Sequence, residues 1–353
     1  MNILVINPGS TSTKIAVYKD EKPFLVKTIR HTSEELSVYD RIAEQYDFRK
    51  NLILNVLNNE GISLSFDAVI GRGGLLKPIR SGVYEVNEAM KYDLLNATMQ
   101  HASNLGGLIA SELASLMPSC KAFIADPVVV DELDDVSRIS GSPLLPRLSV
   151  FHALNQKAIG RKYAKSIRSR YEDLNLVIAH LGGGISVAAH KKGRVVDVNN
   201  ALNGEGPFSP ERAGTLPALQ LVDLCFSGKY TKDELKKMIN GKGGLAAHLG
   251  TTDVLTVVKE AESGNKKVAL ILHAMLYNVA KEIGAKCVAL SGKIDAIILT
   301  GGIAYNPYCV ESLCAQIEFL SPVVVFPGED EMGALATNAL GVLTGDLSCE
   351  LYA

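Results

Sequence analysis

The sequence contains six cysteines, at positions 120, 225, 287, 309, 314 and 349, but no Cys-x-x-Cys pair. This scatter argues against a zinc site or a disulfide framework and favours reduced thiols in the cytoplasm. A net charge of −2 gives no basis for binding nucleic acid or a membrane surface. No apolar run reaches about 18 residues, so no membrane span is expected. The first residues enter a strand at once, so no signal peptide is expected.

The chain is long for a single hydrophobic core. It has 353 residues, of which 47% are hydrophobic, whereas one core rarely serves more than about 250–300 residues. Two domains are therefore expected. The segment from Asp131 to Val150 is rich in Pro, Ser and Gly, and we expect it to cross between them.

Residues 1–18 form the most informative stretch and predict a hairpin with a polar tip. An apolar run from Ile3 to Ile6 is followed by the turn Asn7-Pro8-Gly9, four hydroxyl residues, Lys14 and a second apolar run. Backbone N–H groups, hydroxyls and one ammonium at such a tip suit a phosphate. The stretch is not a Walker A loop, which needs a second glycine before its lysine. An ordinary polar turn is the alternative interpretation.

The same pattern recurs half a chain later. In residues 175–190 an apolar run is followed by His180, three glycines (182–184) and a second apolar run from Ile185. Two similar strand–turn–strand units indicate duplicated domains that face each other, with a nucleotide polyphosphate held between the two turns.

Periodicity and turn residues predict the remaining elements. Helices are expected over 33–60, 87–99, 104–117, 153–171, 267–287 and 331–344, and a capping box from Thr231 to Glu234 is expected to start another. Strands are expected over 66–70, 121–125, 294–299 and 322–326, the last of these ending the sheet structure. The basic side chains of the 153–171 helix, Lys157 among them, are expected to form a solvated face.

Seven motifs in a fixed order, covering nearly the whole chain, resemble the acetokinase branch of the superfamily of acetate and sugar kinases, heat-shock proteins and actin. They are Asn-Pro-Gly-Ser-Thr-Ser-Thr-Lys (7–14), Asp-Pro-Val (126–128), Val-Phe-His-Ala-Leu-Asn (150–155), His-Leu-Gly-Gly-Gly (180–184), Glu-Arg-Ala-Gly (211–214), Thr-Gly-Gly-Ile (300–303) and Pro-Gly-Glu-Asp-Glu-Met (327–332).

The resemblance implies an α/β protein of two duplicated ribonuclease H-like domains, the actin-like ATPase fold, with a cleft between them. Residues 1–150 and about 335–353 would form the N-terminal domain, and residues 151–334 the C-terminal one. The implied reaction is reversible transfer of the ATP γ-phosphoryl group to a short-chain carboxylic acid, giving ADP and an acyl phosphate, with Mg²⁺ as cofactor. Butyrate is the expected acid, and acetate, propionate and branched acids are the alternatives. A homodimer or larger homo-oligomer is implied as well.

Four residues match the family's catalytic positions. Arg72 ends a buried strand, where α/β folds place ligand groups, and its planar fork suits a carboxylate; a surface ion pair is the alternative. Asp126 also ends a strand, although acetate kinases have a Phe-Asp-Thr order there, and a turn cap is the alternative. His152 matches the histidine near the transferring phosphoryl group, and Arg212 the arginine that neutralises its charge. The alternatives are a helix cap for His152 and a mobile loop for Arg212.

The resemblance also assigns binding residues. Phosphate and nucleotide are expected at two turns and one further glycine pair: Asn7, Ser10, Ser12, Lys14, His180, Gly182, Gly183, Gly184, Gly301 and Gly302. The acid is expected at Arg72, Gly74 and Phe151. A metal-associated glutamate is expected at Glu331 or Glu329, with Glu331 favoured, and ordinary helix N-terminal charge preference is the alternative.

Two questions stay open at this stage. Gly73 and Gly74 follow Arg72 and either leave space for a longer acyl chain or satisfy a turn with positive φ. A nucleotide-gated binding protein like actin or the heat-shock proteins is a rival to an enzyme, but such proteins do not need two arginines and a histidine at the site.

Overall fold

The computed structural model describes residues 1–97 and 101–353, and the chain divides into two compact units. Unit 1 comprises residues 1–130 and 330–353, and unit 2 comprises residues 131–329. The C-terminal segment therefore returns to the unit in which the chain began. The domain limits expected from the sequence, near 150 and 334, stay predictions.

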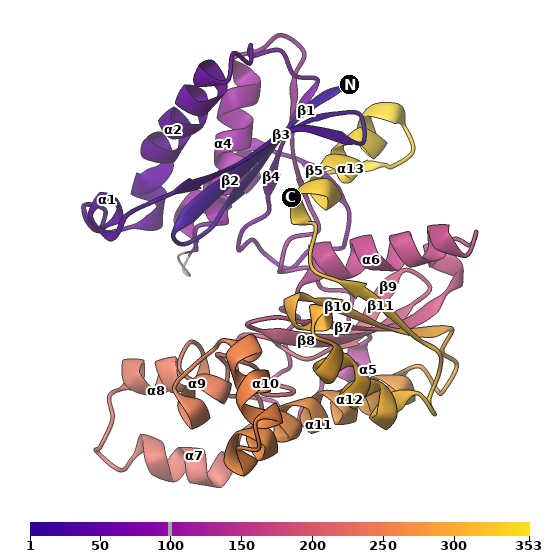
Figure 1. The fold of residues 1–353 in the computed structure, drawn as a ribbon. Coiled ribbons are helices and arrows are strands. Elements are labelled where there is room, and N and C mark those ends of the chain that lie inside the picture. The colour runs from indigo at the N-terminus through magenta and orange to yellow at the C-terminus, as the bar shows by residue number, and fades with distance from the viewer. Residues whose placement is uncertain (98–100) are drawn as a thin grey trace. The chain divides into compact units, whose positions relative to one another are not determined.

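Unit 1 is built on a seven-stranded mixed sheet, part of which is labelled in Figure 1. Its strand order is β12-β5-β6-β4-β1-β2-β3. Its strands are β1 (Asn2–Pro8), β2 (Ser12–Lys19), β3 (Lys22–Arg30), β4 (Ala68–Arg72), β5 (Val83–Glu85), β6 (Lys121–Ala125) and β12 (Cys349–Glu350). Its helices are α1 (Ser33–Ser37), the short 3-10 helix η1 (Ile42–Gln45), α2 (Tyr46–Asn59), α3 (Glu88–Asn96), α4 (Asn104–Ser115) and α13 (Glu331–Thr344). The apolar runs of β1 and β4 are fully buried, as expected for central strands covered on both faces.

Helix α4 approaches strand β4 at two glycines. A Cβ atom on Gly71 would lie 2.1 Å from the carbonyl oxygen of Gly106, and one on Gly106 would lie 2.2 Å from that of Arg72. Neither position has room for a side chain, so the two backbones are in direct contact. Helix α4 therefore packs directly on the backbone at the end of β4.

Unit 2 repeats the antiparallel start of unit 1 within a five-stranded sheet of order β11-β10-β7-β8-β9. The strands are β7 (Asn175–Leu181), β8 (Ile185–Lys191), β9 (Arg194–Val198), β10 (Ala296–Gly301) and β11 (Val323–Pro327). The helices are α5 (Asp135–Arg138), α6 (Ala153–Ser166), η2 (Tyr171–Asp173), α7 (Ala218–Cys225), α8 (Lys232–Ile239), α9 (Gly244–Leu249), α10 (Val254–Glu262), α11 (Lys266–Ala289), η3 (Gly302–Tyr305) and α12 (Pro307–Ile317). Alternate residues of β7 and β8 face α6 on one side of the sheet and α11 on the other.

Several sequence predictions are confirmed. Both hairpins form, with Asn7 opposite Lys14 in the first and His180 opposite Ser186 in the second. The capping box is present at the start of α8, where Thr231 and Glu234 bond reciprocally. Helix α13 spans the predicted 331–344, and β6 spans 121–125.

Other predictions are wrong. The segment 33–60 is broken into α1, η1 and α2. The helix predicted over 153–171 ends at Ser166, and the last strand is β12 rather than 322–326. Lys157 is fully buried instead of solvated, because its ammonium donates to Glu132 (2.6 Å) and to the carbonyl oxygen of Gly193 (2.7 Å). The last residues of the helix predicted over 87–99 lie outside the described residues.

Helix α11 is the one helix of the described chain that is long and apolar enough to cross a membrane, judged by length and composition. One of its faces packs into the core of unit 2, where Val268, Leu272, Met275, Leu276 and Val279 are buried among others. The same length and composition are usual for the central helix of a globular core.

Candidate active site

Three predicted residues lie at one edge of the sheet of unit 1. Strands β1, β4 and β6 run parallel and side by side, with Ile6 opposite Gly71 and Arg72 opposite Ala125. Asn7, Arg72 and Asp126 therefore stand at or just after the carboxyl ends of neighbouring strands. This is the edge at which α/β sheets bind ligands.

Glu331, the first residue of α13, joins this edge. Its carboxylate accepts from Arg72 through both oxygens, at 2.9 and 3.1 Å, and from the Asn7 amide at 2.7 Å. The Arg72 side chain is 26% exposed, so the guanidinium is paired yet reachable from solvent. A bidentate arginine–carboxylate pair is the arrangement that an incoming substrate carboxylate would share or replace.

Asp126 is 1% exposed, and its carboxylate accepts from the backbone N–H of Gly82 (2.8 Å). It adopts a φ of +38°, which is uncommon for a residue with a side chain. The conformation places the carboxyl group at the turn after β6. A cap for this turn, the alternative to a catalytic role, is thus present in the structure, and the catalytic role stays a prediction.

The first turn, residues 9–13, is held by hydrogen bonds from a side chain that was not predicted from the sequence. Arg49 of α2 is fully buried and donates to the carbonyl oxygens of Gly9 (2.8 Å) and Ser12 (3.2 Å) and to the Thr13 hydroxyl (3.0 Å). Gln45, one helical turn earlier, accepts from the same guanidinium. Arg49 thus holds the carbonyl groups of the turn inward, while Ser10 and Lys14 are exposed and Ser12 is half-buried.

The second turn, residues 182–184, is packed against Arg212. The carbonyl oxygen of Gly183 accepts from the Ser209 hydroxyl (2.6 Å), and the guanidinium of Arg212 donates to the carbonyl oxygen of Ala201 (2.8 Å). Burial lowers the pKa of Arg212, and its buried Nε has no hydrogen-bond partner in the described part of the chain. The Arg212 side chain is 19% exposed, so part of the guanidinium is open to an anionic group such as a phosphoryl oxygen.

The loop that carries Arg212 is well fixed, contrary to the mobile-loop alternative. Backbone bonds join Ala213 to Ile239 (2.9 Å), Gly241 to Glu211 (2.8 Å) and Ser209 to the carbonyl oxygen of Arg212 (2.9 Å). The bridge between Arg212 and Asn240 belongs to the same set. A guanidinium on a fixed loop needs little reorganisation when charge develops beside it.

Gly184→Ala is expected to lower kcat about 100-fold, because a misplacement of about 1 Å in a reacting group has effects of this size. A Cβ atom at this position would lie 1.8 Å from Nη1 of Arg212, so the guanidinium has to move. Gly284→Ala is the matched control, since a Cβ at this glycine of α11 meets nothing within 4 Å. Steady-state kinetics compare the two variants, and an unchanged kcat for Gly184→Ala would contradict the placement of Arg212.

The two predicted histidines of unit 2 stack on each other. The rings of His152 and His180 are 3.9 Å apart and 12° from parallel. His152 stands just before α6 and bonds the Ser186 hydroxyl through Nδ1 (2.8 Å). His180 is buried at the end of β7, where its Nδ1 bonds the Asn155 side chain (2.8 Å) and its Nε2 lies 3.6 Å from Glu329. The Nδ1 atom of each ring is thus held by a hydrogen bond.

A pocket of about 230 Å³ adjoins the second turn within unit 2. It is lined by Gly182, Gly183, Pro210, Gly302, Ile303 and Asn306, together with residues 252–255. Gly301 has φ +89°, and a Cβ there would lie 2.4 Å from the carbonyl oxygen of Leu181, so this glycine is required by the fold. A Cβ at Gly302 would meet nothing within 4 Å, so this glycine leaves an open backbone surface at the pocket.

Gly73 and Gly74 do not leave space for the acid, contrary to the prediction from the sequence. A Cβ atom on Gly73 would lie 2.6 Å from Pro127, and one on Gly74 would lie 2.6 Å from Asn104 and 2.8 Å from Leu94. Neither glycine has a positive φ, so the turn explanation fails too. Both are required by close packing. Gly74 and the buried Phe151 stay predictions as acid-binding residues.

No group of three or more His, Cys, Asp or Glu side chains converges to hold a metal ion within residues 1–97 and 101–353. Mg²⁺ is commonly held by one or two carboxylates together with substrate phosphates. A carboxylate offers about four lone-pair positions, and the pairing with Arg72 and Asn7 takes three on Glu331. One oxygen of Glu331 therefore fits a metal whose other ligands come from phosphates and water.

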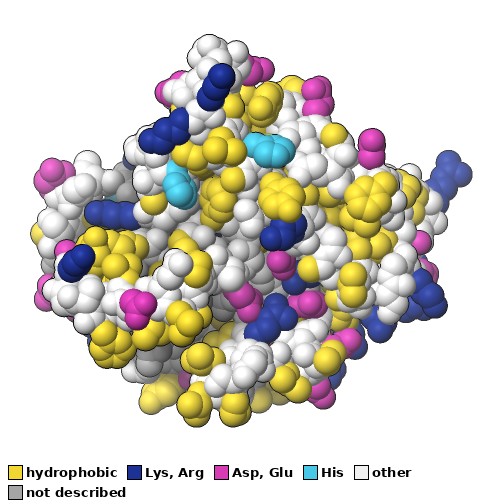
Figure 2. Space-filling model, turned by 90° about the horizontal axis from the view of Figure 1, so that it is seen from below, with side chains coloured by type: hydrophobic (Ala, Val, Ile, Leu, Met, Phe, Trp, Pro, Cys, Tyr) yellow, Lys and Arg dark blue, Asp and Glu magenta, His cyan; other side chains and the backbone are white. Residues whose placement is uncertain are grey.

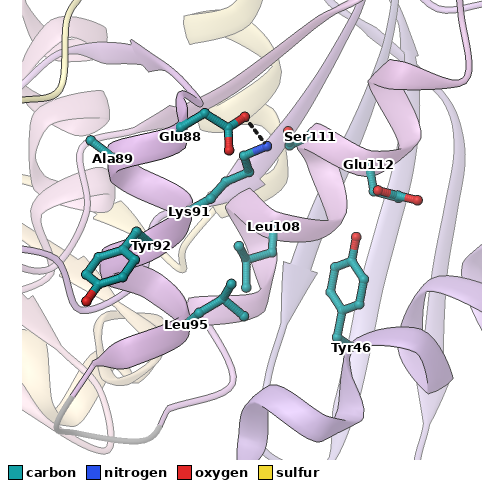
Figure 3. A pocket seen from close by; sticks show the side chains of 9 residues that line it. All are labelled: Tyr46, Glu88, Ala89, Lys91, Tyr92, Leu95, Leu108, Ser111 and Glu112. Atoms are coloured by element: carbon teal, nitrogen blue, oxygen red, sulfur yellow. Dashed lines mark ion pairs between the residues drawn. The ribbon is translucent and has the colours of Figure 1, made fainter.

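A larger groove of about 710 Å³ lies elsewhere in unit 1, between α3, α4 and the start of α2. Figure 3 shows Tyr46, Tyr92, Leu95 and Leu108 along it and the ion pair between Lys91 and Glu88 at one side. None of the predicted site residues lines it. Its size is therefore no guide to the chemistry.

Comparisons of sequence and of structure both find acetate, propionate or butyrate kinases similar to this chain. The acetokinase family profile matches residues 144–324. A probable butyrate kinase of Bacteroides thetaiotaomicron is 63% identical over the full length of both chains, and butyrate kinase 2 of Clostridium acetobutylicum is 53% identical over 99% of each.

Solved structures share the fold at lower identity. Acetate kinase from Porphyromonas gingivalis superposes with a TM-score of 0.79 at 20% identity, covering 97% of this chain and 99% of that one. A propionate kinase from Francisella tularensis gives 0.73 at 17% identity, covering 96% and 98%. The expected fold, two duplicated ribonuclease H-like domains of the actin-like ATPase type, is confirmed.

Proposed function

Because the chain belongs to the acetokinase family, we propose that it is a butyrate kinase, which transfers the γ-phosphoryl group of ATP to butyrate and forms butanoyl phosphate and ADP reversibly. The observation that carries the proposal is that two arginines are each half-buried and held in place, Arg72 by a bidentate carboxylate partner and Arg212 on a fixed loop. The first suits a carboxylate and the second a phosphoryl group.

The carboxylate oxygen attacks the γ-phosphorus directly, and the bond from that phosphorus to the β–γ bridging oxygen breaks to release ADP. A carboxylate is already ionised at neutral pH, so the attack needs no general base. Arg72 holds the acid in competition with Glu331, and Asp126 supports the same strand edge. Arg212 and His152 stabilise the charge on the transferring group, so that catalysis consists of positioning and electrostatic stabilisation.

Each of the two turns is proposed to bind phosphate: the first with Asn7, Ser10, Ser12 and Lys14, and the second with residues 182–184 and His180. The nucleoside lies in the pocket beside Gly302. Glu331 or Glu329 would supply one oxygen to Mg²⁺, which would neutralise phosphate charge.

Butyrate is expected to be the better substrate than acetate. It has two more methylenes, each of which contributes about 0.8 kcal/mol when buried, so kcat/KM for butyrate should exceed that for acetate by about 15-fold. Acyl phosphate trapped with hydroxylamine measures the rate for each acid. Acetate or propionate kinase is the alternative, and equal or better use of acetate would overturn the butyrate assignment.

The protein is proposed to act in the cytoplasm as a homodimer or larger homo-oligomer. Helix α7 is apolar but has no buried residue, and Leu219, Val222 and Phe226 are exposed along it. Figure 2 shows the face that carries α7 and α11, on which apolar side chains gather in patches between charged ones. Light scattering on the purified protein tests the oligomeric state, and a monomer would overturn that part of the proposal.

A further inference from the structure

A row of buried polar side chains leads away from His152. Gln156 follows one helical turn later on α6, while Ser186 and His190 point to the same side of strand β8, two pleats apart. All three are fully buried. The chain of bonds runs from His152 to Ser186, Gln156, His190 and finally Tyr171.

The direction of these bonds follows from one backbone group. Gln156 places an amide atom 3.1 Å from the carbonyl oxygen of Ser186, and a carbonyl oxygen only accepts, so this atom is the NH₂ nitrogen. The amide oxygen then faces Nε2 of His190 at 2.9 Å, and this ring nitrogen must donate. Burial and the nearby Lys157 lower the pKa of His190 well below its usual value, so the ring is neutral and its Nδ1 accepts from Tyr171.

The Ser186 hydroxyl transmits this direction to His152. It accepts from the Gln156 amide at 2.9 Å and from the backbone N–H of His152 at 3.4 Å. A hydroxyl oxygen has two acceptor positions and one proton. With both acceptor positions used, the hydroxyl donates its proton to Nδ1 of His152, 2.8 Å away.

We propose that this chain holds His152 as the neutral tautomer with its proton on Nε2, so that the ring presents a fixed N–H donor to the phosphoryl group. Ser186 and Gln156 are positioning residues for that donor. The inference deepens the proposed function, since it rests on the role given there to His152. Stacking on His180 supports it, because two imidazolium rings 3.9 Å apart would repel each other.

The opposite tautomer would turn a lone pair toward the anionic oxygens. A lone pair there repels the charge that an N–H donor stabilises, and removal of one such donor lowers kcat by about 10²–10³ in other enzymes. The buried chain prevents this loss by fixing the proton before substrate binds.

The tautomer is measured directly by ¹⁵N NMR of protein labelled in its histidine rings, which distinguishes protonated from unprotonated ring nitrogens. The His152 signals are assigned by their absence from His152→Ala. The proposal expects an unprotonated Nδ1 and a protonated Nε2 in the wild type without ligands. A protonated Nδ1 would overturn it, whether or not any variant folds.

Kinetics of Ser186→Ala test the consequence. We expect kcat to fall about tenfold, a smaller loss than removal of the donor itself, with KM for ATP and butyrate unchanged within about twofold. The His152 nitrogen shifts should move toward the average of the two tautomers. Ser321→Ala is the matched control, since its buried hydroxyl donates to the carbonyl oxygen of Ile294 (3.1 Å) far along the sheet, and its kcat should match the wild type.

Failure of this inference is distinguishable from failure of the proposed function. An unchanged kcat in Ser186→Ala, with His152→Ala strongly impaired, would overturn the positioning role alone. An unchanged kcat in His152→Ala would overturn the role of that histidine in the proposed function. The NMR measurement would still test the tautomer of His152 independently of kcat.

Discussion

Arg212→Ala is expected to lower kcat by about a thousandfold, the lower end of what arginines contribute to phosphoryl transfer. The side chain is 19% exposed and its loop is fixed by backbone bonds, so the guanidinium is held in place for charge that develops beside it. KM for ATP and butyrate should change much less, as for an interaction made mainly in the transition state. Hydroxylamine trapping under saturating substrates measures kcat.

Arg72→Ala is the informative contrast to this variant. It should raise KM for butyrate as well as lower kcat, because Arg72 holds the carboxylate before the reaction. Arg212→Lys tests geometry, since a lysine keeps the charge but lacks the planar fork. A kcat near that of the wild type in Arg212→Ala would contradict the role assigned to this residue.

Arg49→Met is expected to lower the free energy of unfolding by about 3–5 kcal/mol, because several acceptors lose a buried charged donor at once. Burial lowers the pKa of Arg49 to about 10, so the guanidinium is still charged at neutral pH. Its loss leaves the carbonyl groups of Gly9, Ser10 and Ser12 without their buried donor. Each unsatisfied group costs roughly 1–3 kcal/mol.

The same variant should weaken ATP binding if the first turn holds phosphate. Urea unfolding gives the stability, and ATP titration of the folded protein gives the affinity. The control is Arg170→Met, because the Arg170 side chain is 75% exposed and surface changes usually stay within about 0.5 kcal/mol. Stability of Arg49→Met equal to that of the control would show that the turn does not depend on Arg49.

Local patterns were sufficient for much of the fold. The hairpins follow from apolar runs interrupted by turn residues, and the capping box of α8 follows from four adjacent residues, Thr231 to Glu234. Strand β12 was missed because its two residues pair with β5, more than 260 positions earlier in the chain. Its hydrogen bonds depend on tertiary position, which a short sequence window does not contain.

The residues of the candidate site likewise divide into those that the sequence indicated and those that it did not. Residues that terminate strands, such as Arg72 and Asp126, were found because strand ends are visible in the sequence. Arg49 and Gln156 were missed because each lies within a helix, and only the packing of that helix brings it to a turn or a histidine. Their polar character at positions facing the core was the available signal, and the same signal was misinterpreted at Lys157 as a solvated face.

The contact between Gly71 and Gly106 has a consequence for how substrate range can change. Because α4 and the end of β4 are in backbone contact at these glycines, a side chain on either one has to push the helix and the strand apart next to Arg72. A library of variants at these two positions, made to widen the range of carboxylic acids that the protein accepts, would therefore consist mainly of inactive proteins. New specificity has to arise from side chains carried by other segments, while the strand and helix beneath Arg72 stay constant.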